Sequence, residues 1–157
     1  MSHRSSAFID KCSATLPLER IHWEAATDNL FGATNANIGL IPARGGNEST
    51  KFKLYHFAWT LDIGSPSTPN ATCYIQAYPT MDLTSFMRIE WKPRKSGLEG
   101  TRRIANVLDL CIPGFSAVWN SAYITRVDVA FDVRPLSIDQ VFAFTKSAKT
   151  CHLSYSH

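Results

Sequence analysis

The chain has 157 residues, of which 45% are hydrophobic and 18% are charged, a composition of one folded domain that excludes disordered, collagen-like and coiled-coil chains. Its Lys and Arg residues exceed its Asp and Glu residues by three, and its four cysteines form no CxxC or Cys/His cluster, which disfavours a zinc site. The chain has neither the apolar segment of a signal peptide nor a membrane-spanning stretch, so we expect a cytoplasmic protein, without membrane partners, whose cysteines are reduced and buried.

The first half of the chain is predicted to be mainly β-structure. Residues 1–20 show no hydrophobic period, and we expect a flexible N-terminus there, followed by a single domain over residues 21–157. Aromatic and β-branched residues, partly in alternation, then predict strands. These strands are expected at residues 51–62, 72–78 and 86–91, with a loop rich in Gly, Ser and Pro at 64–70.

In the second half the hydrophobic period changes to that of a helix. Ile104, Val107, Leu108 and Cys111 recur at helical spacing and predict a helix over about 99–111. Residues 122–133 are the strongest strand signal of the chain. Ser137 is a candidate N-cap for a further helix, and residues 151–155 for a final strand. The order predicts an α+β fold: a mainly antiparallel sheet with helices on one face, containing a β-α-β unit.

The excess positive charge lies in one segment. Residues 88–103 hold six basic and two acidic side chains, whereas the rest of the chain carries no net positive charge. The basic residues are Arg88, Lys92, Arg94, Lys95, Arg102 and Arg103. Such clustering indicates a polyanionic partner such as DNA. The alternative is a solvated basic turn.

Two of the predicted strands carry charges on one face, because side chains alternate along a strand. Arg126, Asp128 and Asp132 share a face of residues 122–133, and Glu90 lies among basic residues on the strand before. Aspartates four residues apart on one strand are about 13 Å apart, too far to bind one ion. We therefore expect a Mg²⁺ or Mn²⁺ site that needs Glu90 and Asp128 as opposed residues of neighbouring strands. The alternative is a ladder of ion pairs, such as Arg88 with Asp132.

The segment ITRVDVAFD at residues 124–132 resembles the T-R-x-D-x-A-x-D strand of the replication initiators of rolling-circle plasmids and filamentous phages. The segment RIEWKPRK at residues 88–95 is similar to the strand and basic turn that precede this motif. Together the matches cover about residues 84–146. Asp128 and Asp132 correspond to the acidic positions of the motif, and Arg126 to its arginine.

The resemblance implies metal-dependent, site-specific DNA nicking and strand transfer during replication initiation. A tyrosine would attack the phosphodiester, with Mg²⁺ or Mn²⁺ polarising the phosphate. The implied partners are the plasmid or phage origin, single-stranded or as a hairpin, and a host helicase. Tyr155 is the candidate nucleophile, although initiators usually continue well past the motif, so the chain is expected to be the N-terminal part of a longer initiator domain.

Three functions stay open on the sequence. The first is the nicking initiator, and the second is a non-catalytic DNA-binding module or remnant initiator on the same scaffold. The third is an interaction domain that does not bind DNA, in which the charged strand faces form only ion pairs. The sequence contains no His-x-His pair, so it lacks the two-histidine metal site of other nickase families. For the first function, this absence fits initiators whose metal site is built from carboxylates.

Overall fold

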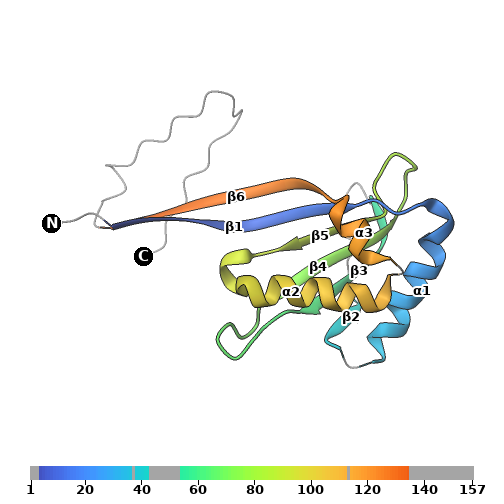
Figure 1. Cartoon of the computed structure of the whole chain (residues 1–157), viewed down its shortest axis with the longest axis horizontal. Helices are drawn as coiled ribbons and strands as arrows, with labels where there is room; N and C mark the ends of the chain where they lie inside the picture. The colour runs from blue at the N-terminus through green and yellow to red at the C-terminus, as the bar shows by residue number, and fades with distance from the viewer. Residues whose placement is uncertain (1–3, 37, 43–53, 113, 135–157) are drawn as a thin grey trace.

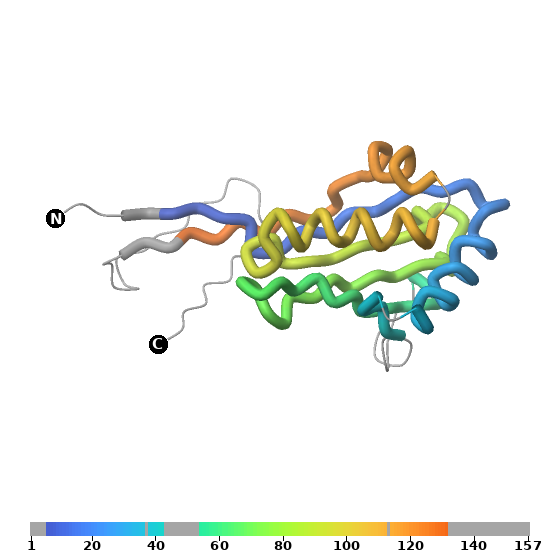
Figure 2. The backbone as a smooth tube through the Cα atoms, turned by 60° about the horizontal axis from the view of Figure 1, so that its bottom comes forward, coloured from blue at the N-terminus to red at the C-terminus, as the bar shows by residue number. Residues whose placement is uncertain are grey.

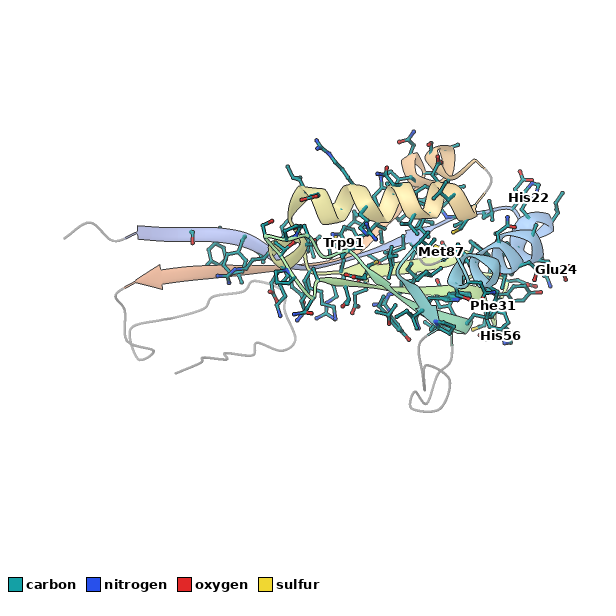
Figure 3. The ribbon with its side chains drawn as sticks, turned by 90° about the horizontal axis from the view of Figure 1, so that it is seen from below. His22, Glu24, Phe31, His56, Met87 and Trp91 are labelled. Atoms are coloured by element: carbon teal, nitrogen blue, oxygen red, sulfur yellow. The ribbon has the colours of Figure 1, made fainter. Side chains whose placement is uncertain are left out.

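The computed structural model describes residues 4–36, 38–42, 54–112 and 114–134 and has an α+β fold (Figure 1). Six strands form one antiparallel sheet in the order β2-β3-β4-β5-β1-β6. The strands are β1 (Arg4–Leu16), β2 (Leu40–Pro42), β3 (Tyr55–Asp62), β4 (Thr72–Pro79), β5 (Met87–Trp91) and β6 (Tyr123–Arg134). The helices are the short 3-10 helix η1 (Arg20–His22), α1 (Trp23–Thr34), α2 (Pro93–Cys111) and α3 (Phe115–Asn120). Figure 3 shows α2 and α3 on one side of the sheet.

Strand β1 overturns the expected flexible N-terminus. Residues 4–16 form a strand of 13 residues that pairs with both β5 and β6 and so lies inside the sheet. Its alternate residues Cys12, Ala14 and Leu16 are buried in the core. The prediction was wrong because these side chains are mostly small, so their alternation carries little hydrophobic signal before the neighbouring strands are in place.

The other predicted strands are confirmed within the residues described, and so is the helix predicted at about 99–111. Alternation along β5 buries Met87, Ile89 and Trp91 on the side that carries the helices. Ile104 and Leu108 of α2 are fully buried in the same core. Helix α1 was not predicted, and the predicted helix at Ser137 and strand at residues 151–155 lie outside the described residues.

Helix α2 is divided near its start. Gly97 has a φ of +62°, so the first turn, residues 93–96, is kinked relative to the rest of the helix. Three residues later, a Cβ built on Gly100 would lie 2.5 Å from the Ser96 Cβ and 3.0 Å from the Ile63 carbonyl oxygen. Glycine at position 100 therefore lets the helix pack closely against the chain that follows β3, and this packing positions the first turn at the end of the sheet.

The β-α-β unit is present in a split form. Strands β5 and β6 both run antiparallel to β1, so they are parallel to each other with β1 between them. Beyond the helices, β1 and β6 continue as a two-stranded arm, which Figure 2 shows clearly. On the edge strand β6 the side chains of Val127, Val129 and Phe131 are exposed. Among the described residues, three cysteines are free and buried, as expected: Cys12, Cys73 and Cys111.

Candidate nucleic-acid interface

The face of the sheet that points away from the helices is polar. It carries the alternate residues of four neighbouring strands, whose register places them in rows. One row crosses the sheet from Tyr74 through Glu90 and Ser13 to Arg126. We call this surface the open face; its residues are Lys11, Ser13, Thr15, Thr72, Tyr74, Gln76, Arg88, Glu90, Arg126 and Asp128.

Glu90 lies at the centre of the open face and is held by three groups. The Lys11 Nζ lies 2.6 Å from its Oε1 and the Arg88 Nη2 lies 3.2 Å from its Oε2. The hydroxyl of Ser13, a fully buried residue, also donates to Oε2 at 3.2 Å. Both oxygens of the carboxylate are therefore engaged by side chains from β1 and β5.

Asp128 forms its own pair further along the sheet. Arg126 donates from Nε to Oδ1 at 2.8 Å and from Nη2 to Oδ2 at 2.7 Å. These hydrogen bonds are the main reason why the pKa of Asp128 is lowered from its ordinary value, and the charges of Arg126 and Lys11 act in the same direction. The open face thus carries ion pairs, but Arg88 lies opposite Thr15 and Gln76 and is not the register partner of Asp132.

The expected pairing of Glu90 with Asp128 across neighbouring strands is wrong. Strand β1 lies between β5 and β6, so Ser13 is opposite Glu90 and Lys11 is opposite Asp128. The backbone of Asp132 pairs with that of Ser6, further out on the arm. In the part of the chain that the structure describes, His, Cys, Asp and Glu side chains form no group of three or more that could hold a metal ion.

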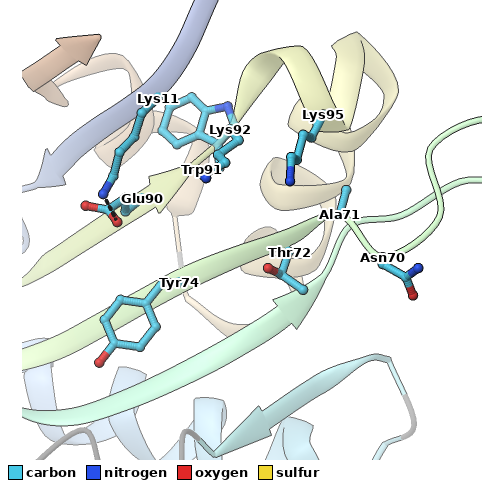
Figure 4. A pocket seen from close by; sticks show the side chains of 9 residues that line it. All are labelled: Lys11, Asn70, Ala71, Thr72, Tyr74, Glu90, Trp91, Lys92 and Lys95. Atoms are coloured by element: carbon cyan, nitrogen blue, oxygen red, sulfur yellow. Dashed lines mark ion pairs between the residues drawn. The ribbon is translucent and has the colours of Figure 1, made fainter. Parts of the chain in front are cut away.

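A cavity of about 240 Å³ lies beside Glu90 on the open face. Its lining includes three lysines, Lys11 from β1 and Lys92 and Lys95 from the start of α2. Figure 4 shows Lys95 and Tyr74 around this cavity, together with the ion pair between Lys11 and Glu90. Among the described residues Lys92 and Lys95 have no carboxylate within ion-pair distance, so their charges are available to an anion. We call this cavity the lysine pocket.

The structure divides the predicted basic residues between two places. Lys92 and Lys95 line the lysine pocket, Arg88 lies beside it on β5, and the Arg94 guanidinium stacks 3.7 Å above the Phe8 ring. Arg102 and Arg103 lie beyond the kink, on the long part of α2 that packs over the other side of the sheet. Arg103 donates from Nε to the Asp62 carbonyl oxygen at 2.9 Å, so it joins α2 to the end of β3.

Sequence reasoning missed Lys11 and Ser13, because the N-terminal segment was expected to be flexible. The signal that could have found them is the alternation of polar residues 11, 13 and 15 with small apolar ones. Of the tyrosines, Tyr155 lies outside the described residues, and Tyr123 is 66% exposed at the start of β6. Tyr74 lines the lysine pocket.

No protein-family model matches the chain, and no curated protein and no solved structure is significantly similar to it. None of the helices in the described residues is both long and apolar enough to cross a membrane.

Proposed function

We propose that the chain is a DNA-binding domain of the rolling-circle initiator type and that the open face binds the DNA backbone. The observation that supports this most is the lysine pocket, where Lys92 and Lys95 have no carboxylate partner among the described residues and lie beside the row of polar strand residues. Phosphates are the anions that such ammonium groups bind in nucleic-acid complexes. The third lysine, Lys11, is paired with Glu90 and contributes less net charge.

The ion pairs also limit the affinity. Lys11 and Arg88 share the single negative charge of Glu90, so this group keeps one net positive charge, and Arg126 is neutralised by Asp128. With two or three phosphates contacted, log K should fall with log salt concentration with a slope of about −2 to −3. We therefore expect sequence-independent binding with a Kd on the order of 10⁻⁶ to 10⁻⁴ M at physiological salt.

Nicking is the second part of the proposal, and its support is the resemblance of residues 124–132 to the initiator motif. A single one of the carboxylates Glu90, Asp128 and Asp132 would hold Mg²⁺ or Mn²⁺, because β1 separates Glu90 from Asp128 and Asp132 lies further out on the arm. Tyr155 is the proposed nucleophile. The bound ion would polarise the scissile phosphate. Either Glu90 or Asp128 would have to exchange a basic partner for the ion, since both carboxylates are engaged by Lys11, Arg88 or Arg126.

The DNA-binding test compares two charge reversals of equal size. Fluorescence anisotropy with a labelled single strand and a labelled hairpin measures the Kd of the Lys95→Glu and Arg102→Glu variants. Lys95 lines the lysine pocket, whereas Arg102 is exposed on the long part of α2. We expect Lys95→Glu to weaken binding about tenfold and Arg102→Glu to weaken it at most about twofold.

Equal losses of affinity in both variants would show that DNA does not occupy the open face. No binding by the unaltered chain would leave the interaction domain as the function.

For nicking, the DNA is incubated with the chain and Mn²⁺ and separated on a denaturing gel. A covalent adduct that disappears in Tyr155→Phe is the expected result. Binding without an adduct would instead identify the non-catalytic DNA-binding module.

A further inference from the structure

A second cavity, of about 410 Å³, opens between α1 and the strands β3 and β4. Figure 3 shows Glu24, Phe31 and His56, three of its lining residues, gathered at the end of the molecule where α1 lies. Thr27, which also lines it, is only 4% exposed, and its hydroxyl has no hydrogen-bond partner in the structure as described. A buried hydroxyl without a partner is uncommon in a folded protein.

Aromatic rings form the walls of this cavity. The rings of Phe31 and Phe57 lie 5.1 Å apart in an edge-to-face arrangement. The Tyr78 ring lies 6.0 Å from that of Phe57 and 5.6 Å from that of His56. Alternation along β4 would place Tyr78 on the open face with Tyr74, but its φ of +61° turns the side chain towards these rings. Residues other than glycine rarely adopt this conformation.

Two carboxylates lie at the same cavity. Glu24 and Asp28 are four residues apart on α1, so their side chains are neighbours on one face of the helix. Both are exposed, and within the described ranges neither forms an ion pair. Glu24 lies in the first turn of α1, where the helix dipole favours an acidic side chain. Adjacent like charges destabilise a helix, so the helix alone gives no reason for Asp28 beside Glu24. We call the combination of these carboxylates with the aromatic walls the acidic-aromatic site.

We propose that the acidic-aromatic site binds the guanidinium group of an arginine side chain presented by a partner protein. A guanidinium is planar and stacks on aromatic faces, and its N–H groups match carboxylate oxygens. The hydroxyl of Thr27 offers a further acceptor in the wall. The open face lies on the other side of the sheet from Phe57 and α1, so this binding does not depend on DNA binding.

The test titrates the isotope-labelled full chain with N-acetyl-arginine methylamide and follows backbone amide shifts by NMR at about 0.15 M salt. The matched probe is the citrulline derivative, which has nearly the same shape but no charge. We expect the arginine probe to shift the amides of Thr27 and Phe57 with a Kd on the order of 1–10 mM, as for a ligand of few atoms. The citrulline probe should cause no saturable shift at the same concentrations.

Variants then assign the binding to the two carboxylates. The double variant Glu24→Gln/Asp28→Asn is expected to weaken arginine binding about tenfold, since it removes both charges from exposed positions where folding is little affected. Glu99→Gln, an exposed carboxylate on α2, is the control and should leave the Kd unchanged. Equal binding of arginine and citrulline, shifts confined to other surfaces, or an unchanged Kd in the double variant would each overturn the proposal.

Discussion

The close packing of α2 at Gly100 gives a sharp prediction for the Gly100→Ala substitution. The added Cβ would meet the Ser96 Cβ at 2.5 Å and the Ile63 carbonyl oxygen at 3.0 Å. Neither neighbour is the end of a flexible side chain, because one is a Cβ and the other belongs to the backbone. The helix must therefore shift away from the end of β3, and the first turn of α2, which carries Lys95, must shift with it.

Two opposing terms set the magnitude. Alanine is favoured over glycine in a helix interior by about 1 kcal/mol. Inserting a methyl group into a closely packed contact costs about 1–3 kcal/mol. Because both contacts are shorter than ordinary van der Waals separation, we expect the upper part of that range. The net loss in the free energy of unfolding should be about 1–2 kcal/mol.

The matched control is Gly32→Ala on α1, where a Cβ would meet nothing within 4 Å. Only the helix-propensity term applies there, so this variant should gain about 0.5 kcal/mol near the end of its helix. Urea unfolding at constant m-value measures both changes. With m of about 2 kcal/mol/M, Gly100→Ala should lower the midpoint by about 0.5–1 M. A Gly100→Ala protein as stable as the parent would refute the packing argument.

Two further predictions concern the open face. Arg126→Gln should raise the pKa of Asp128 towards its ordinary value, because the hydrogen bonds from Arg126 are the main cause of its lowering. The lowered pKa stabilises the fold above the ordinary aspartate pKa, and this stabilisation is lost as pH falls through the lowered value, so the variant should lose less stability on acidification. NMR titration of the carboxyl carbon measures the shift, and an unchanged pKa would contradict the pairing. Ser13→Ala should lower the free energy of unfolding in urea by about 1 kcal/mol, because it removes the hydrogen bond from the buried hydroxyl to Glu90, although Arg88 still contacts the same oxygen. An equally stable variant would show that this hydrogen bond contributes nothing to stability.

Much of the local structure could be predicted because it depends on periodicity alone. The alternation of Met87, Ile89 and Trp91 indicates a strand with one buried face, and the structure confirms it. The helical spacing of Ile104, Val107 and Leu108 likewise places a helix where α2 runs. The same alternation correctly put Glu90 and Asp128 on the polar sides of their strands. These results follow from the chain geometry of single elements, which needs no knowledge of their neighbours.

The candidate site depended on contacts that single elements do not encode. Both Glu90 and Arg126 lie opposite Ser13, because β1 inserts between β5 and β6. The same insertion places Lys11 beside Glu90, in the position where Asp128 had been expected. Likewise, the kink at Gly97 separates Lys95 from Arg102, although both belong to one basic stretch of the sequence.

The sequence by itself therefore determined which residues face the core and which carry charge, since those patterns repeat within a few residues. Only the tertiary structure decided which charges meet. Strand order joins residues that are 77 positions apart, such as Ser13 and Glu90. Strand order depends on the free energy of burying the whole sheet face under the helices. The hydrophobic period of a single strand or helix does not indicate that free energy.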